Sequence, residues 1–171
     1  MTDHDLETPW AREGRWIAAL SGALSDSSIA TGDHAALRRM DPQAPSGRAL
    51  IAAERLFVRS DLRPEGDDLK RWLLILHCLG LAGGRHAWDA DAGRVLAELR
   101  YSEERLTRLL SSDFAVVADM MPRLARLLGS KGSPIDWLPL AQILRWTGRN
   151  EDRADHARNR IARSYARAVA T

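Results

Sequence analysis

The chain has 171 residues, of which 45% are hydrophobic, and a formal net charge of +2. This length can bury the core of one domain or of two small ones, and no stretch reaches the roughly 18 consecutive apolar residues of a membrane-spanning helix. Residues 1–7 are acidic and lack the basic-then-apolar pattern of a signal peptide. The single cysteine, Cys78, excludes an internal disulfide and a zinc site built from paired cysteines. We therefore expect a globular cytoplasmic protein with no membrane partner.

Positive charge is concentrated towards the C-terminus. Residues 1–99 hold 12 lysines and arginines against 15 acidic residues, whereas residues 100–171 hold 13 against 8. All but two of the 25 cationic residues are arginine, which a GC-rich genome would produce. The planar guanidinium also grips phosphate through two hydrogen bonds and stacks on bases. Composition alone leaves both explanations open.

Apolar residues recur with helical spacing from end to end, and no sustained alternation typical of a β-strand is present. The sequence therefore predicts an all-α protein, a helical bundle. The expected helices are 9–24, a short one that Asp33 caps and Asp41-Pro42 ends, one that Ser46 opens, 69–84, 93–100, 103–110, 113–128, one that Asp136 caps and Gly148 closes, and 151–170.

Breaks in the helical pattern predict two lobes. A proline-rich segment near 42–46 and a glycine-rich segment near 83–93 separate helices, so we expect an N-terminal helical lobe at 1–90 and a C-terminal one at 91–171. Pro122 must kink or divide the helix over 113–128.

Several large or reactive side chains are expected in the core. Trp16, Trp72 and Trp137 are predicted to fill the spaces between helices rather than to stack on bases. His77 is expected at the edge of the core, and the thiol of Cys78 is expected to be buried.

Each catalytic or metal-binding pattern lacks a part. The segment DADAG at 89–93 resembles a calcium loop but has Gly93 and Arg100 at ligand positions. GLAGG and GSKGS do not form a phosphate-binding loop, and the five histidines have no i, i+4 pair. His77 and Cys78 are adjacent, so on a helix they point about 100° apart and cannot act as base and nucleophile. We predict no enzyme activity, no cofactor and no metal.

Arginines on helix surfaces are the remaining candidates for function. His156, Arg160, Arg163 and Arg167 follow the spacing i, i+4, i+7 and i+11, which places them on one side of the last helix. A solvated helix face explains this stripe as well as nucleic-acid contact does. The pair at 38–39 ends a short helix, where cations also complement the helix dipole.

Three stretches of the chain, taken in order, match motifs of one known family. The first is GDHAALRRMDP, a short arginine-paired segment after the first helix, and the second is AGRVLAELRYSEERLTRLLSSD, which follows the pattern G-R-x-L-A, E-x-R, L-L/I-x-x-D. The third, PRLARLLGSKGSPIDWLPLAQILRWTGR, follows the progression R-L-L, D-W, L, L-x-W, G-R/K. Together they resemble the CasB-type small subunit of the type I-E CRISPR Cascade complex, over about residues 10–158.

The resemblance implies a two-lobed, non-catalytic helical protein that works beside a second copy of itself, the other Cascade subunits and crRNA. Its basic surface would help to hold target DNA, including the displaced strand, while the guide RNA supplies sequence specificity. The matching basic positions are Arg38, Arg39, Arg126 and Arg149. Lys70 and Arg71 lie near another basic position of the family but are offset from it. Asp67 is the alternative candidate for the residue at the equivalent position.

Two other functions are open to a chain of this kind. A sequence-specific helical DNA-binding regulator would need a recognition helix that reads the major groove and, usually, a symmetric dimer. A small helical hydrolase would need a cluster of carboxylates or histidines. Neither a clear helix-turn-helix segment nor paired ligands can be identified in the sequence.

Overall fold

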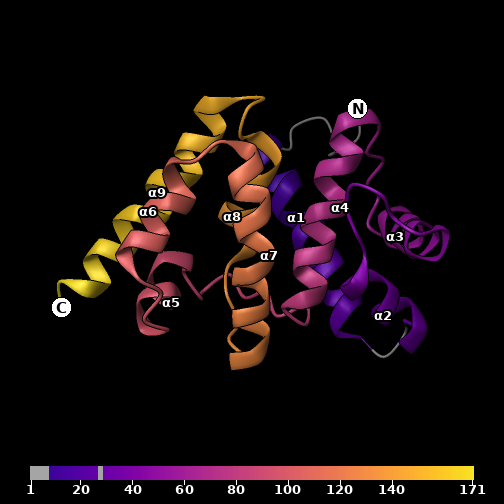
Figure 1. Ribbon diagram of the computed structural model, residues 1–171, viewed down its shortest axis with the longest axis horizontal. Helices are drawn as coiled ribbons and strands as arrows, with labels where there is room; N and C mark the ends of the chain where they lie inside the picture. The colour runs from indigo at the N-terminus through magenta and orange to yellow at the C-terminus, as the bar shows by residue number, and fades with distance from the viewer. Residues whose placement is uncertain (1–7, 27–28) are drawn as a thin grey trace.

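The computed structural model describes residues 8–26 and 29–171, and these residues form nine α-helices (Figure 1). The all-α prediction is confirmed. Extended pairing within the described ranges is limited to one isolated parallel bridge between His86 and Ile135. The helices are α1 (Pro9–Ser25), α2 (Thr31–Arg39), α3 (Gly47–Arg59), α4 (Gly66–Leu81), α5 (Ala92–Glu98), α6 (Glu103–Ser111), α7 (Phe114–Lys131), α8 (Trp137–Trp146) and α9 (Glu151–Val169).

Most helices begin where a side chain can satisfy a free backbone amide. The side chains of Thr8, Ser46, Ser102 and Asp136 each accept a hydrogen bond from the first turn of the next helix. The prediction that Asp33 caps α2 is wrong, because the helix starts at Thr31 and Asp33 lies in its first turn. There its carboxylate suits the positive end of the helix dipole.

Helix α7 continues through Pro122, so the proline does not divide it. A proline removes one backbone donor and disturbs one turn. Here the same face of the helix is buried before and after that turn. Val117 and Met121 precede Pro122 on this face, and Leu124 and Leu128 follow it. Packing of this side against the rest of the molecule holds the two segments in one helix.

Helix α4 lies at the centre of the core. All ten residues from Arg71 to Gly80 are buried, and the helix packs against α1, α2, α7 and α8. Trp72 and Trp137 are buried as predicted, whereas Trp16 is half-buried with its ring edge against Trp72. Cys78 is fully buried, and burial raises the pKa of its thiol.

The two ends of the chain share one core. In Figure 1, α2, α3 and α4 lie on one side and α5, α6 and α9 on the other. Helices α1 and α8 contact each other and both contact α4, so buried residues from before and after residue 90 belong to one cluster. The division into lobes at 1–90 and 91–171 stays a prediction. No helix of the described chain has the length and apolar character needed to cross a membrane.

Candidate nucleic-acid interface

Exposed arginines line two grooves, one on each side of α7. The first, the α6–α7 groove, has a volume of about 450 Å³ and is lined by Arg105 and Arg108 of α6 and by Arg123 of α7. Apolar side chains of α7 and Tyr101 form the rest of its lining. Arg105 and Arg108 are exposed because Leu106 and Leu109 turn the other side of the short helix into the core.

The second groove, which we call the α2–α7 groove, lies between the α2–α3 connection and α7. Its volume is about 730 Å³, and its basic residues are Arg123 and Arg126. Asp119 and Arg123 line both grooves, since they stand on the ridge of α7 between them. Arg38 and Arg39 end α2, immediately before Met40 at the margin of this groove. We define the α7 surface by six exposed arginines: Arg38, Arg39, Arg105, Arg108, Arg123 and Arg126.

Most arginines of the α7 surface have no ion-pair partner among the described residues. Arg123 pairs with Asp119 one turn earlier, at 3.0 Å. The other five arginines make no ion pair among the described residues. Their guanidinium groups keep all their donors for a ligand. Arginines of α6 and α7 line the two grooves, and Arg38 and Arg39 end α2, next in the chain to Met40 of the second groove.

Arg71 is not part of any exposed surface. Its Nη1 donates to the carbonyl oxygens of Leu144 and Thr147 at 3.0 and 2.9 Å, and its guanidinium carbon lies 3.3 Å from the centre of the Phe114 ring. Only 7% of the residue is exposed. Arg71 therefore joins α4 to the end of α8 and to α7, and its guanidinium is engaged within the fold. Its neighbour Lys70 is exposed.

Arg149 is already paired with acidic residues of α4. Its Nη1 lies 2.8 Å from the Asp68 carboxylate and its Nε lies 3.5 Å from Asp67. Burial by itself would raise the pKa of Asp68, but hydrogen bonds from Arg145 and Arg149 hold that pKa below its usual value. A phosphate at Arg149 would have to compete with both carboxylates.

The four residues of the α9 stripe lie in three different environments. Arg160 reaches Asp136, the cap of α8, with 2.7 Å between Nη2 and Oδ2, and the Asp136 side chain is only 1% exposed. Arg163 and Arg167 are exposed and have no ion pair among the described residues. His156 instead lies against the ring of Trp10. None of these α9 residues lines either groove beside α7.

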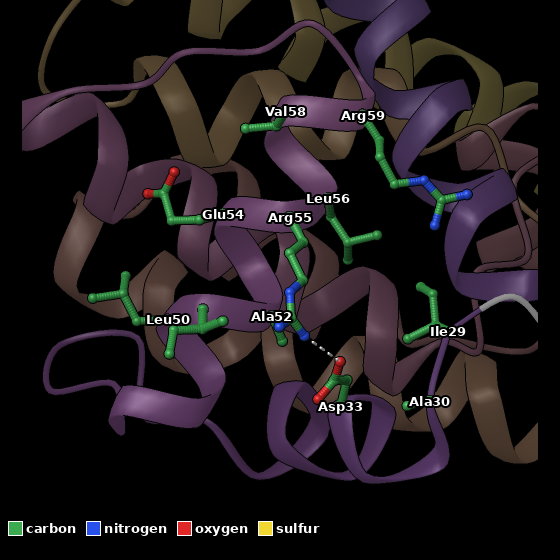
Figure 2. A pocket seen from close by; sticks show the side chains of 11 residues that line it. Ile29, Ala30, Asp33, Leu50, Ala52, Glu54, Arg55, Leu56, Val58 and Arg59 are labelled. Carbon is green, nitrogen blue, oxygen red and sulfur yellow. Dashed lines mark hydrogen bonds and ion pairs between the residues drawn. The ribbon is translucent and has the colours of Figure 1, made fainter.

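A third groove, lined by the start of α2 and by α3, differs in character. Figure 2 shows its lining from α2 and α3, where Arg55 lies 3.4 Å from Asp33. Arg48 also pairs with Asp33, at 3.4 Å. The remaining walls are largely apolar, including Ile51 and Val58, which are more than half exposed. Since its arginines are partly neutralised, this groove is a poorer site for a polyanion than the α7 surface.

The comparisons with known proteins identify the family. Residues 33–165 match the family model described as CRISPR-associated protein Cse2. The chain belongs to the Cse2 family. The crystal structure of a Cse2-family CRISPR-associated protein from Thermus thermophilus matches with a TM-score of 0.65, over 94% of this chain and 99% of that one. At 24% identity this likeness shows a shared fold. No curated protein matches the chain significantly.

In this Cse2-family chain, three arginines of the α7 surface were not among the sequence predictions. Arg105 and Arg108 are spaced i, i+3 on an amphipathic helix, and Arg123 precedes the predicted Arg126 by three residues. That spacing was a usable signal for a shared helix side. The spacing could not reveal that α6 and α7 lie next to each other.

Within the part of the chain that the structure describes, no three His, Cys, Asp or Glu side chains gather as metal ligands. Asp91, from the calcium-like segment, caps α5, and the backbone oxygen of Asp89 accepts a hydrogen bond from Arg94.

Proposed function

We propose that this Cse2-family chain is a non-catalytic small subunit of a type I-E CRISPR Cascade surveillance complex. In this proposal a pair of copies, bound to the other subunits and to crRNA, holds target DNA and especially the displaced strand. The proposal rests on the α7 surface, where five of the six exposed arginines form no ion pair among the described residues. Family membership supplies the link to CRISPR systems.

The arrangement suits a strand held irrespective of its sequence. Guanidinium groups bind phosphate oxygens and displace condensed counterions, which gives affinity that depends on salt and hardly on base identity. The arginines stand on α2, α6 and α7, whose buried sides fix them to one core. A rigid row of cations loses little conformational freedom on binding apart from that of the side chains.

Lys70, Arg149, Arg163 and Arg167 are secondary candidates in this proposal. Lys70, Arg163 and Arg167 are exposed and could extend the contact along the complex. Arg149 could contribute only after exchanging Asp67 or Asp68 for phosphate. The α7 surface therefore has priority in experiments.

The DNA-binding part of the proposal can be tested in the assembled complex. We expect the triple variant Arg38→Ala, Arg39→Ala, Arg126→Ala to dissociate faster from target DNA while folding normally. Each lost contact to single-stranded DNA should flatten the plot of log affinity against log salt by about 0.7. All target sequences should be affected alike.

A matched control removes the same charge elsewhere. Arg48→Ala, Arg55→Ala and Arg94→Ala delete three exposed arginines that already pair with Asp33 or Glu98. This variant should keep the parent's salt dependence and R-loop lifetime. If both triple variants behave alike, net charge matters and the α7 surface does not.

Assembly is tested separately by co-purification. A tagged large Cascade subunit should retain this chain together with crRNA. Recovery of only a free homodimer bound to one preferred duplex sequence would instead identify a transcriptional regulator.

A further inference from the structure

The α2–α7 groove has the size and lining of a site for one small planar group. Its volume of about 730 Å³ falls within the range of about 300–1,000 Å³ that holds small ligands. Leu74 lies in its lining from α4, and Phe114, Ala118 and Pro122 line it from α7. The groove therefore combines apolar walls with the guanidinium groups at its α7 side.

A buried histidine adds a defined hydrogen-bonding group to this groove. His77 lines the groove and is only 5% exposed. Its Nδ1 lies 2.9 Å from the carbonyl oxygen of Leu37. Because a carbonyl can only accept, Nδ1 carries the proton in the neutral ring and Nε2 is left as an acceptor. Burial, with a contribution from Arg126, lowers the pKa of His77 and so favours that neutral ring.

The acidic residues of the groove argue against an anion inside it. The Asp41 carboxylate accepts from the backbone amide of Gln43 at 2.9 Å, and Asp119 pairs with Arg123. These carboxylates and a neutral Nε2 are all acceptors. They would repel a phosphate that entered the groove but would accept N–H groups from a base.

We propose that the α2–α7 groove receives one unstacked nucleobase of the bound strand, with Arg126 on the adjoining phosphate. This inference rests on the proposed function and adds a base contact to it. The base would lie on the apolar lining, and one of its N–H groups would donate to Nε2 of His77. Every nucleobase has such an N–H group, so the contact does not select a sequence.

The test uses the isolated chain with two probes of equal length, a thymidine oligonucleotide and an abasic sugar-phosphate oligomer. Fluorescence anisotropy at low salt gives the ratio of their affinities. The parent should prefer the thymidine probe by about tenfold, the order of magnitude for stacking one base on a protein surface. Arg126→Ala should weaken both probes and leave the ratio nearly unchanged.

The decisive variant is His77→Asn. The asparagine Nδ2 can still donate to the Leu37 carbonyl, and its Oδ1 takes the place of the ring carbon Cδ2, so that no acceptor is left at the position of Nε2. We expect the ratio to fall by at least about threefold and the binding of the abasic probe to stay at the parent level. Ala118→Phe adds a ring to the groove from α7, replaces neither His77 nor Leu37, and should abolish the preference as well.

The outcomes separate this site from the proposed function. If both variants fold and keep the parent's ratio, the nucleobase site is wrong, whereas a flattened salt dependence of the arginine variants in the assembled complex would still support DNA retention. If the parent itself has no preference for the thymidine probe, the groove does not take a base. Should His77→Asn melt far below the parent, Ala118→Phe decides the question alone.

Discussion

The carboxylate of Glu13 on α1 lies 2.7 Å from Nη1 of Arg145 on α8, and only 3% of Glu13 is exposed. The same carboxylate accepts hydrogen bonds from Trp146 at 2.7 Å and from Gln142 at 3.0 Å. Arg145 also holds Asp68 of α4 through Nε and Nη2. One buried network thus ties the first helix to helices from the middle and the end of the chain.

Glu13→Ala should destabilise the fold strongly. Its removal leaves the donors of Trp146 and Gln142 without their acceptor and takes from Arg145 one of its two carboxylate partners. Breaking a buried ion pair of this kind costs about 3–5 kcal/mol. Urea unfolding followed by circular dichroism measures the loss. Asp152→Ala, at an exposed acidic residue in the first turn of α9, is the control and should change stability by less than about 1 kcal/mol. Equal midpoints for the two variants would contradict the role of the network.

Arg160→Ala should act on stability, and Arg163→Ala should not. The first change leaves the Asp136 carboxylate, which is 1% exposed, without its cation. Losing a charge-assisted hydrogen bond to a buried group costs about 1.5–3 kcal/mol. Arg163 is exposed on the same helix and makes no ion pair among the described residues. Thermal melts of both variants give the comparison, and a parent-like melt of Arg160→Ala would show the pair to be dispensable.

Stability should fall as the solution is acidified below about pH 6.5. Burial lowers the pKa of both His77 and His86 from the ordinary value of 6.5, and the Asp136 carboxylate only partly opposes this at His86. Below about pH 6.5 the unfolded chain therefore binds more protons at these two histidines than the folded chain does. The contribution of the two histidines to the free energy of unfolding is constant above pH 6.5. Below that pH it decreases, by at most about 1.4 kcal/mol per pH unit for each histidine.

Urea midpoints measured at a series of pH values track this effect. His77→Asn should remove the contribution of His77 to this loss of stability, so that the urea midpoint depends less steeply on pH. A profile of the parent that is flat, or that rises on acidification, would contradict the effect of burial on these rings.

Trp137→Ala should cost about 3–5 kcal/mol, because the ring is completely buried and its removal leaves a cavity. Trp10→Ala removes a ring that is 40% exposed and should cost clearly less. Chemical unfolding of both variants compares them. If Trp137→Ala unfolds like the parent but binds DNA poorly, the ring acts in binding rather than in packing.

Local features of the fold were predictable from sequence, because caps act within one turn. Thr8, Ser46, Ser102 and Asp136 could be recognised from the residue type and the next few residues of the chain, and each caps a helix. Asp33 misled the prediction of a cap because the helix begins two residues earlier, at Thr31, and its N-cap residue is Ala30, which has no side-chain hydrogen bond to offer. Apolar spacing identified the long helices for the same local reason.

Sequence patterns could not predict which arginines are exposed and unpaired in the fold. Arg71 and Arg126 both lie in helical segments with apolar neighbours, yet one is buried against α7 and α8 and the other is exposed. Arg149 and Arg160 look like free cations in the sequence, but their partners Asp68 and Asp136 come from distant parts of the chain. Tertiary packing decides which guanidinium groups are left for a ligand.

The burial of Cys78 makes the folded chain a clean background for site-specific labelling. The thiol is 0% exposed, and burial raises its pKa, so it offers almost no thiolate to a maleimide dye. A cysteine introduced at the exposed position of Arg39 or Arg108 would then react alone. Dyes at such positions could report distances along bound DNA while Cys78 is kept. In the chain without added cysteines, the slow rate at which Cys78 itself is labelled would measure how often the core opens.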